Sequence, residues 1–302
     1  GTRLRDEYGK KCDYDKVAES WELSCHKDGP SVVADGEYKG LTLNEYIEKA
    51  GKGVLGKNCE RFENFPILIK LIDAKDNLSV QVHPDNDYAM RVEGEYGKTE
   101  MWYVVDCDEG ATLLYGFKHE ITKEEFARRI ADNTLLEVTN AVPVKKGDVF
   151  FIKSGTLHAI GKGILIAEIQ QNSNTTYRIY DYGRVGKDGK PRELHVDKAL
   201  DVTKLAPAEQ YPETPVEKKD GYDIKLLSKC EYFTTYRVNV ETKAELDADE
   251  NSFNSILVLE GEPVISGGET VSAKKGESVF ISAGTGKYTV EGKCTFVLTK
   301  ID

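Results

Sequence analysis

KKGDVFFIKSGTLHAI, residues 145–160, returns 129 positions later as KKGESVFISAGTGKYT, residues 274–289. Both copies contain Lys-Lys-Gly, an apolar strand-like segment and a Gly-Thr pair. A repeat at a constant offset indicates the architecture before any local motif is considered, because each copy should form the same kind of unit. The copies differ at one chemically important position, since His158 becomes Lys287 in the second. The repeat therefore predicts two similar β-barrels, only one of which binds a metal.

The composition of the 302-residue chain is typical of an ordinary globular protein with room for two domains. Its net charge of -11 argues against binding to nucleic acid or to a membrane surface, which requires a basic face. An anionic substrate would therefore need a local basic pocket. No apolar run approaches the roughly 20 residues that span a bilayer. The six cysteines are scattered, without a Cys-x-x-Cys pair, so we expect reduced thiols and a cytoplasmic protein.

Short apolar or alternating segments bounded by Gly, Asp and Asn dominate the chain, which is typical of β-sandwiches and barrels. Helical patterns are few, and the two clearest, at 41–49 and 122–130, each contain a Thr-x-x-Glu capping box. Residues 204–220 hold three prolines and little apolar content, which indicates a linker. We predict a catalytic domain at 1–205, a linker at 206–220 and a metal-free barrel at 221–302.

Polar side chains recur on one face of the predicted strands. Alternation along LSVQVHP, residues 78–84, places three of them together: Ser79, Gln81 and His83. Along GKTEMWYVV, residues 97–105, the shared face holds Lys98, Glu100 and Trp102. Taken singly, the first pattern also fits a half-exposed edge strand, and the second also fits a solvated ion pair.

A third segment, SGTLHAIGKG at residues 154–163, places His158 after a tight Gly turn. The donors of the three segments together form a four-ligand set that suits zinc: Gln81, His83, Glu100 and His158. Two neutral imidazoles, one carboxylate and one amide oxygen do not exclude iron, manganese or cobalt. The second copy has Lys287 in place of His158, and residues 221–302 contain no histidine. A protonated lysine is a poor ligand, so we expect the metal in the first barrel alone.

At these residues the chain resembles the type I phosphomannose isomerases in their short bacterial form, a family of the cupin superfamily. The motifs that carry the resemblance are LSVQVHPDNDYA, GKTEMWYVVD, SGTLHAI and QQNSNTTYRIYDYGR, in this order. The resemblance is strong over about residues 1–200 and weak in the C-terminal repeat. It implies a mainly β fold of two cupin-type jelly-roll barrels with a few short helices. It also implies the interconversion of mannose 6-phosphate and fructose 6-phosphate with one Zn²⁺ per chain.

The resemblance assigns roles to single residues. The zinc ligands of the family fall on Gln81, His83, Glu100 and His158. The family's catalytic arginine matches Arg178, and two further active-site positions match Lys98 and Glu168. The expected phosphate or substrate contacts match Ser79 and Lys70.

An aldose–ketose isomerase moves a proton between C1 and C2 through an enediol(ate), whose negative charge needs stabilisation. Either Glu168 or Lys98 could act as the base, and the sequence does not choose between them. A non-catalytic sugar-binding cupin is one alternative, although it would not need Arg178, Lys98 and Glu168. A metal-dependent cupin oxygenase or decarboxylase is another, but such proteins usually carry His-x-His where this chain has Gln-Val-His. The expected partner is a small sugar phosphate, with no nucleic acid and no membrane.

Overall fold

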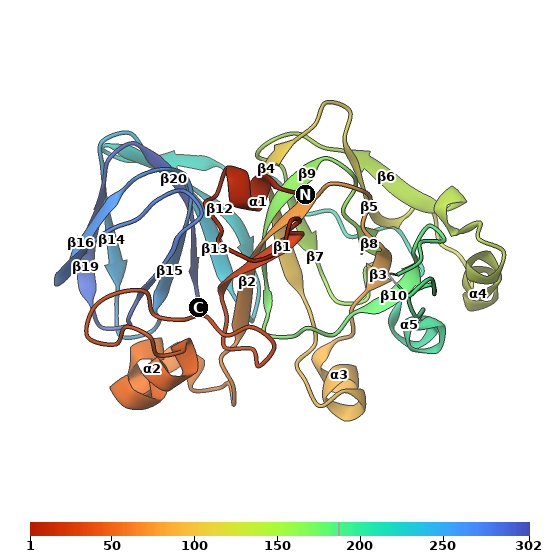
Figure 1. Cartoon of the computed structure of the whole chain (residues 1–302), viewed down its shortest axis with the longest axis horizontal. Coiled ribbons are helices and arrows are strands. Elements are labelled where there is room, and N and C mark those ends of the chain that lie inside the picture. Colours follow the sequence, from red (N-terminus) through yellow and green to blue (C-terminus); the bar gives the residue numbers. More distant parts are fainter. Residues whose placement is uncertain (187) are drawn as a thin grey trace. The chain divides into compact units, whose positions relative to one another are not determined.

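The computed structural model describes residues 1–186 and 188–302, and it is mainly β (Figure 1). The chain divides into two compact units. The first unit holds Gly1 and Ile72–Tyr211, and the second holds Thr2–Leu71 and Pro212–Asp302. The break after Tyr211 falls inside the predicted linker 206–220, whereas residues 2–71 group with the C-terminal segment. The mainly β fold with few helices is confirmed, and the domain limits stay a prediction.

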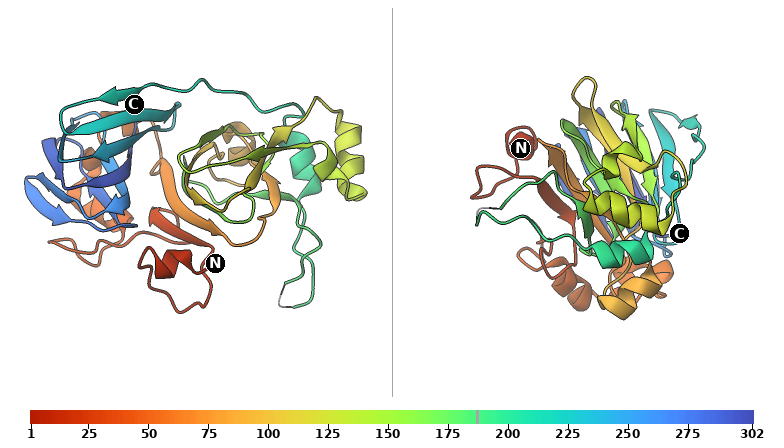
Figure 2. Two further views of the ribbon diagram at one scale, coloured as in Figure 1. Left: turned by 90° about the horizontal axis from the view of Figure 1, so that it is seen from above. Right: turned by 90° about the vertical axis from the view of Figure 1, so that its right-hand side faces the viewer.

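The strands of the N-terminal two thirds of the chain form two five-stranded sheets. One has the order β1-β2-β9-β4-β7, with β1 Glu19–Leu23, β2 Ile67–Ala74, β9 Ile164–Gln171, β4 Glu100–Cys107 and β7 Val149–Ile152. The other has the order β10-β3-β8-β5-β6, with β10 Tyr177–Tyr180, β3 Val80–Val82, β8 His158–Ala159, β5 Thr112–Phe117 and β6 Thr139–Pro143. Figure 2 shows strands of the first unit curving around a common interior.

The C-terminal strands repeat this arrangement. A six-stranded sheet has the order β11-β12-β13-β20-β15-β18, with β11 Val216–Lys218, β12 Tyr222–Lys229, β13 Thr234–Val240, β20 Cys294–Lys300, β15 Asn254–Gly261 and β18 Ser278–Ile281. A four-stranded sheet has the order β14-β19-β16-β17, with β14 Lys243–Ala248, β19 Gly286–Glu291, β16 Val264–Gly267 and β17 Glu269–Ser272. The order β2-β9-β4-β7 thus matches β13-β20-β15-β18, and β3-β8-β5-β6 matches β14-β19-β16-β17. The repeat seen in the sequence is a repeat of the fold.

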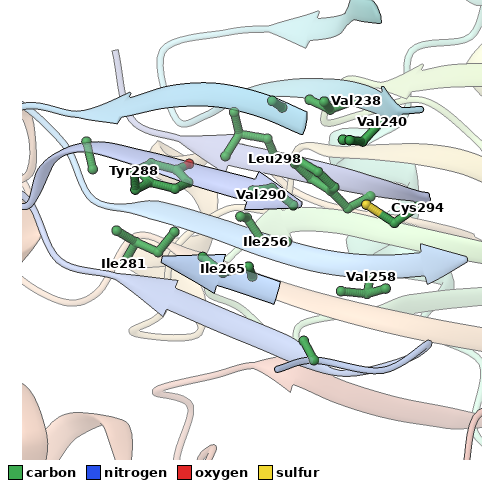
Figure 3. Close-up of a cluster of buried hydrophobic side chains, with 14 residues drawn as sticks. Val238, Val240, Ile256, Val258, Ile265, Ile281, Tyr288, Val290, Cys294 and Leu298 are labelled. Atoms are coloured by element: carbon green, nitrogen blue, oxygen red, sulfur yellow. The ribbon is translucent and has the colours of Figure 1, made fainter. Parts of the chain in front are cut away.

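Each pair of sheets encloses an apolar core. In the second unit the core takes side chains from both sheets, including Ile256, Ile265, Tyr288 and Leu298 (Figure 3). In the first unit Trp102, Ile166 and Leu113 belong to one core between the sheets. Each large apolar side chain buried in this way contributes about 1.5–3 kcal/mol to folding. These cores hold the strand registers in place, because a slip by one residue would turn every apolar side chain to the other face.

Helices cover the outer face of the β10-β3-β8-β5-β6 sheet. Val80 and Val82 of β3 pack there with helices α4, Lys123–Ala131, and α5, Val196–Val202. The remaining helices are α1 Arg3–Asp6, α2 Leu43–Ala50, α3 Asn86–Val92 and the 3-10 helices η1 Lys52–Leu55, η2 Lys57–Cys59 and η3 Leu135–Glu137. None of the helices among the described residues is long and apolar enough to cross a membrane.

The two helices predicted from the sequence are confirmed with their caps. The Thr42 hydroxyl accepts a hydrogen bond from the Glu45 backbone, the Glu45 carboxylate accepts one from the Thr42 backbone, and α2 follows. The Thr122 hydroxyl caps α4 in the same way. Sequence analysis missed α3 and α5, which have seven residues each. Helices this short show little periodicity and depend on tertiary packing.

Within the second unit, Gly56 lets η2 pack closely against the loop before β15. The Asn58 backbone N–H donates to the Asn251 carbonyl at 2.9 Å, and the Lys57 N–H donates to Glu250 at 3.1 Å. Gly56 has a φ of +87°, and a Cβ there would lie 2.4 Å from the Asn251 carbonyl oxygen. This position therefore requires glycine for both its backbone conformation and its lack of a side chain.

We predict that Gly56→Ala lowers the free energy of unfolding by at least about 2 kcal/mol, from left-handed backbone strain and steric overlap. Gly53→Ala is the matched control, because no atom lies within 4 Å of a Cβ built there. The control should stay within about 0.5 kcal/mol of the parent chain. Urea unfolding followed by circular dichroism measures both differences. Equal stability of the two variants would show that the close approach at Asn251 is not required.

Candidate functional site

The strand register aligns three predicted site residues across one sheet of the first unit. Gln81 on β3 pairs with His158 on β8, and Arg178 on β10 pairs with Gln81 on its other side. Directly opposed residues of antiparallel strands point to the same face. The neighbouring pair, Tyr177 and Val82, belongs to the core under the helices. Gln81, His158 and Arg178 therefore face the interior between the two sheets.

The other sheet supplies Glu100 and Glu168 to the same interior. On β4, Glu100 and Trp102 share a face, and Trp102 belongs to the core between the sheets. Trp102 pairs with Glu168 of β9, and its indole N–H donates to Glu168 Oε2 at 2.9 Å. The Trp102 ring also meets the His158 ring edge-on, with the ring centroids 5.2 Å apart. The indole thus positions both a predicted ligand and a predicted catalytic carboxylate.

Three predicted metal ligands converge on one point. The Nε2 atoms of His83 and His158 lie 3.1 Å apart. Glu100 Oε1 lies 3.2 Å from His158 Nε2, and Glu100 Oε2 lies 3.6 Å from His83 Nε2. All three side chains are at most 1% exposed. Within residues 1–186 and 188–302, this is the single group of three His, Cys, Asp or Glu side chains close enough to share an ion.

Backbone carbonyls fix which imidazole nitrogens face this point. His83 Nδ1 lies 3.0 Å from the Thr175 carbonyl oxygen, and His158 Nδ1 lies 2.8 Å from that of Thr156. A carbonyl oxygen can only accept, so each Nδ1 carries the hydrogen and donates it. With the hydrogen on Nδ1, a neutral ring presents its Nε2 lone pair toward the other ring and Glu100. This tautomer is the one that metal-ligating histidines adopt.

Glu100 provides negative charge at the same point. Burial raises the pKa of its carboxyl group, but neighbouring positive charge, that of Lys98 first, outweighs burial and holds the pKa well below its usual range. Lys98 Nζ lies 3.4 Å from Glu100 Oε2 and 3.3 Å from His83 Nε2. Neither Glu100 oxygen accepts a hydrogen bond of good geometry from the described residues. Two imidazole nitrogens and a buried carboxylate that converge on one point are a donor set that fits a bound metal cation.

The Arg178 guanidinium uses only some of its N–H donors in hydrogen bonds with the described residues. Its Nη1 donates to the Glu193 carbonyl at 3.0 Å, and its backbone N–H donates to His195 Nδ1 at 3.1 Å. Its buried Nε has no hydrogen-bond partner among the described residues. Burial and the neighbouring Arg192 lower the pKa of Arg178, although a guanidinium stays protonated at neutral pH. Arg178 therefore places a cation next to Gln81, and its Nε–H can still donate a hydrogen bond.

The two predicted substrate contacts are both buried. Ser79 directly precedes β3 and is 7% exposed. Lys70 lies on β2 and belongs to the second unit, where its Nζ is 3.7 Å from a Glu19 carboxylate oxygen and 4.9 Å from the centre of the Trp21 ring. The cluster of His83, Glu100 and His158 does not include them.

The corresponding interior position of the second unit holds a tyrosine rather than the lysine predicted from the repeat. Lys287 is exposed, and Tyr288, one residue later, lies in the core. Tyr288 pairs with Leu246, as His158 pairs with Gln81. Asn254 takes the place of Glu100, and its amide donates to the Tyr288 hydroxyl at 2.9 Å. A hydrogen-bonded pair thus occupies the positions that correspond to the predicted metal ligands His158 and Glu100 of the first unit.

Some contributors to the site left no signal in the sequence. The carbonyls of Thr156 and Thr175 orient the imidazoles, and backbone groups carry no residue preference. Trp102 was recognised on the ligand face of its strand, but its contact with Glu168 depends on pairing between β4 and β9. Alternation along β4 also places Val104 on the face of Trp102, so the sequence pattern alone does not single out Trp102.

Comparisons with known proteins show which family the chain belongs to. Residues 1–110 match the family model "Phosphomannose isomerase type I, catalytic domain", and residues 223–301 match "Mannose-6-phosphate isomerase, cupin domain". The chain is 39% identical over 303 residues to "Mannose-6-phosphate isomerase ManA" of Bacillus subtilis (strain 168), covering 100% of this chain and 94% of that protein.

Solved structures show the same likeness. The crystal structure of the mannose 6-phosphate isomerase from Bacillus subtilis matches with a TM-score of 0.93 at 38% identity, covering 99% of this chain and 94% of that one. A zinc-bound mannose 6-phosphate isomerase matches with a TM-score of 0.78 at 17% identity, covering 99% and 95%, which shows a shared fold alone. With relatives this similar along its whole length, the chain belongs to the type I mannose-6-phosphate isomerase family of enzymes.

Proposed function

We propose that this chain is a zinc-dependent aldose–ketose isomerase that interconverts mannose 6-phosphate and fructose 6-phosphate through an enediol(ate). The observation that carries the proposal is the convergence of His83, His158 and Glu100 on one buried point, with Arg178 on the same face two strands away from His158. The family assignment supports an isomerase over a sugar-binding protein or an oxygenase.

Gln81, His83, Glu100 and His158 would hold the metal. The donors are two neutral imidazoles, one carboxylate and one amide oxygen, which suit Zn²⁺. With a single anionic ligand the bound ion keeps net positive charge, and it would act as a Lewis acid toward the oxygens of the substrate. The fixed Nδ1 hydrogen bonds of both histidines keep the ligand atoms oriented before the ion arrives.

Arg178 would stabilise the negative charge that develops on the substrate oxygens O1 and O2. Its Nη1 is held by the Glu193 carbonyl, so the guanidinium is positioned before the substrate binds. Its Nε is buried and has no partner among the described residues, which leaves a donor for a substrate oxygen. A preorganised donor in a buried site stabilises a developing oxyanion far more than the same donor in water.

Two groups of the chain can move the proton between C1 and C2. Lys98 Nζ lies 3.4 Å from Glu100 Oε2 and 3.3 Å from His83 Nε2, directly beside the proposed metal ligands. Glu168 faces the interior and has one oxygen fixed by the Trp102 indole. A base must come within hydrogen-bond reach of the proton that it removes, and both side chains occupy the interior that a sugar would enter.

The phosphate of the substrate requires cationic or hydrogen-bonding partners of its own. The net charge of -11 gives no general attraction for a dianion, so local groups must bind it. We propose Lys70 and Ser79 for this role, because both are buried polar groups.

The six cysteines are free, which supports a place in the reducing cytoplasm.

The metal proposal predicts that Glu100→Gln removes zinc from the chain. The purified parent chain should carry about one zinc per chain, and Glu100→Gln should retain less than about a tenth of that after dialysis, because loss of the carboxylate removes the anionic ligand. Glu168→Gln is the matched control on the neighbouring strand β9, and it should keep the metal while kcat falls. Elemental analysis by mass spectrometry measures the content. Full zinc content in Glu100→Gln would refute this ligand set.

The role of Arg178 predicts that Arg178→Ala lowers kcat for mannose 6-phosphate by a factor of about 10² or more, as expected for the loss of a transition-state donor. Zinc content should stay the same. Arg129→Ala, which removes an arginine from the surface helix α4, should leave kcat within about twofold of the parent enzyme. A coupled assay for fructose 6-phosphate measures all three proteins. If Arg178→Ala changes stability but not kcat, Arg178 is structural.

A further inference from the structure

The second unit contains a cavity of about 560 Å³ that the proposed function does not use. It lies beside β18, which is the edge strand of its sheet. The β16–β17 hairpin, the start of β19, the end of β1 and residues 31–46 complete its lining. All of these segments belong to the second unit. The volume is in the range that takes a small organic ligand.

Aromatic rings form part of the wall. Tyr46 of α2 meets Tyr38 edge-on, with the ring centroids 5.1 Å apart, and meets Phe280 of β18 in the same way at 6.1 Å. The Tyr46 hydroxyl is hydrogen-bonded to Ser282 Oγ at 2.7 Å, which ties α2 to the end of β18. Tyr38 already attracts one cation, because Lys49 Nζ lies 5.4 Å from its ring centre. Rings of this kind attract positive charge to their faces.

The charged side chains that line the cavity are all acidic. The described residues that line the cavity include no Lys, Arg or His, but they include four carboxylates: Glu22, Asp35, Glu37 and Glu269. The last three are exposed, whereas the Glu22 side chain is 5% exposed. A cavity with this lining repels a sugar phosphate and attracts a cation.

Two buried polar atoms of the lining lack hydrogen-bond partners among the described residues. Glu22 Oε2 accepts a hydrogen bond from Lys10 Nζ at 2.6 Å, and the Ser20 side chain also interacts with this carboxylate, but Glu22 Oε1 accepts no hydrogen bond of good geometry. Ser278 Oγ is also buried without a partner. Leaving a buried carboxylate oxygen unsatisfied costs more than leaving a neutral group unsatisfied. Glu22 Oε1 and Ser278 Oγ therefore favour a ligand that brings its own N–H donors.

We propose that this cavity binds an organic ammonium ion, meaning a small molecule with an apolar body and a positively charged amine. The amine would donate to Glu22 Oε1 and Ser278 Oγ, and the apolar body would lie against Tyr46, Tyr38 and Phe280. This site is separate from the residues proposed for isomerisation, and it takes ligands of the opposite charge to the sugar phosphates.

Three probes with the same phenyl body test the charge preference at pH 7: phenethylamine, 2-phenylethanol and 3-phenylpropionate. Isothermal titration calorimetry on the full chain should show phenethylamine binding with one site per chain. The amine should bind at least about tenfold more tightly than the neutral alcohol, and the carboxylate should not bind detectably. Equal affinity for all three probes, a preference for the alcohol, or no binding of the amine would overturn the proposal.

Substitutions in the cavity lining test whether phenethylamine binds there. Glu22→Gln should weaken phenethylamine binding by at least about tenfold, whereas Glu231→Gln, a control on the exposed surface of the same unit, should not change it. Tyr46→Phe keeps the ring and should bind as the parent chain does, and Tyr46→Leu removes the ring and should bind more weakly. The Tyr46 pair serves as the test if Glu22→Gln fails to fold. Binding that survives Glu22→Gln and Tyr46→Leu in folded proteins would place the amine elsewhere.

Discussion

Two imidazole lone pairs face each other at 3.1 Å inside the first unit, beside a carboxylate that accepts no hydrogen bond from the described residues. Such an arrangement favours positive charge where His83, His158 and Glu100 converge, and Lys98 Nζ lies within 3.4 Å of two of these groups. Strand pairing and backbone hydrogen bonds hold these side chains in position. The β3–β8 pairing sets the row of ligands, and the carbonyls of Thr156 and Thr175 set the tautomers. The stability of the surrounding cores keeps these donors together before any ion binds.

The second unit shows what the same fold does when this constraint is removed. Its strand order is the same, but Tyr288 and Asn254 occupy the interior positions of His158 and Glu100. A phenol and an amide satisfy each other by a hydrogen bond, so they need no ion. Lys287 points to solvent because the strand after the Gly-Thr turn is shifted by one residue relative to the first copy. That shift moves side chains to the other face of the strand.

Many of the strands and candidate site residues could be predicted from the sequence, because the alternation of polar and apolar side chains along a strand is a local property. Gln81 and His83 were expected on one face from spacing alone, and the strands that carry Glu100 and Glu168 were recognised from their apolar runs. Thr42 and Thr122 marked two helices through their capping motifs. The helix α3 could not be predicted in this way, since seven residues give too little periodicity. The inward turn of Tyr288 could not be predicted either, because a one-residue register shift depends on strand pairing rather than on composition.

Anomalous diffraction at the zinc absorption edge would show directly which residues bind the metal. Crystals of the full chain grown with zinc should give one strong peak per chain. It should lie within about 2.0–2.3 Å of the Nε2 atoms of His83 and His158, an oxygen of Glu100 and the amide oxygen of Gln81. The second unit should show no peak near Tyr288 and Asn254. A zinc-replete, active enzyme whose peak lies away from His83, His158 and Glu100 would contradict the account.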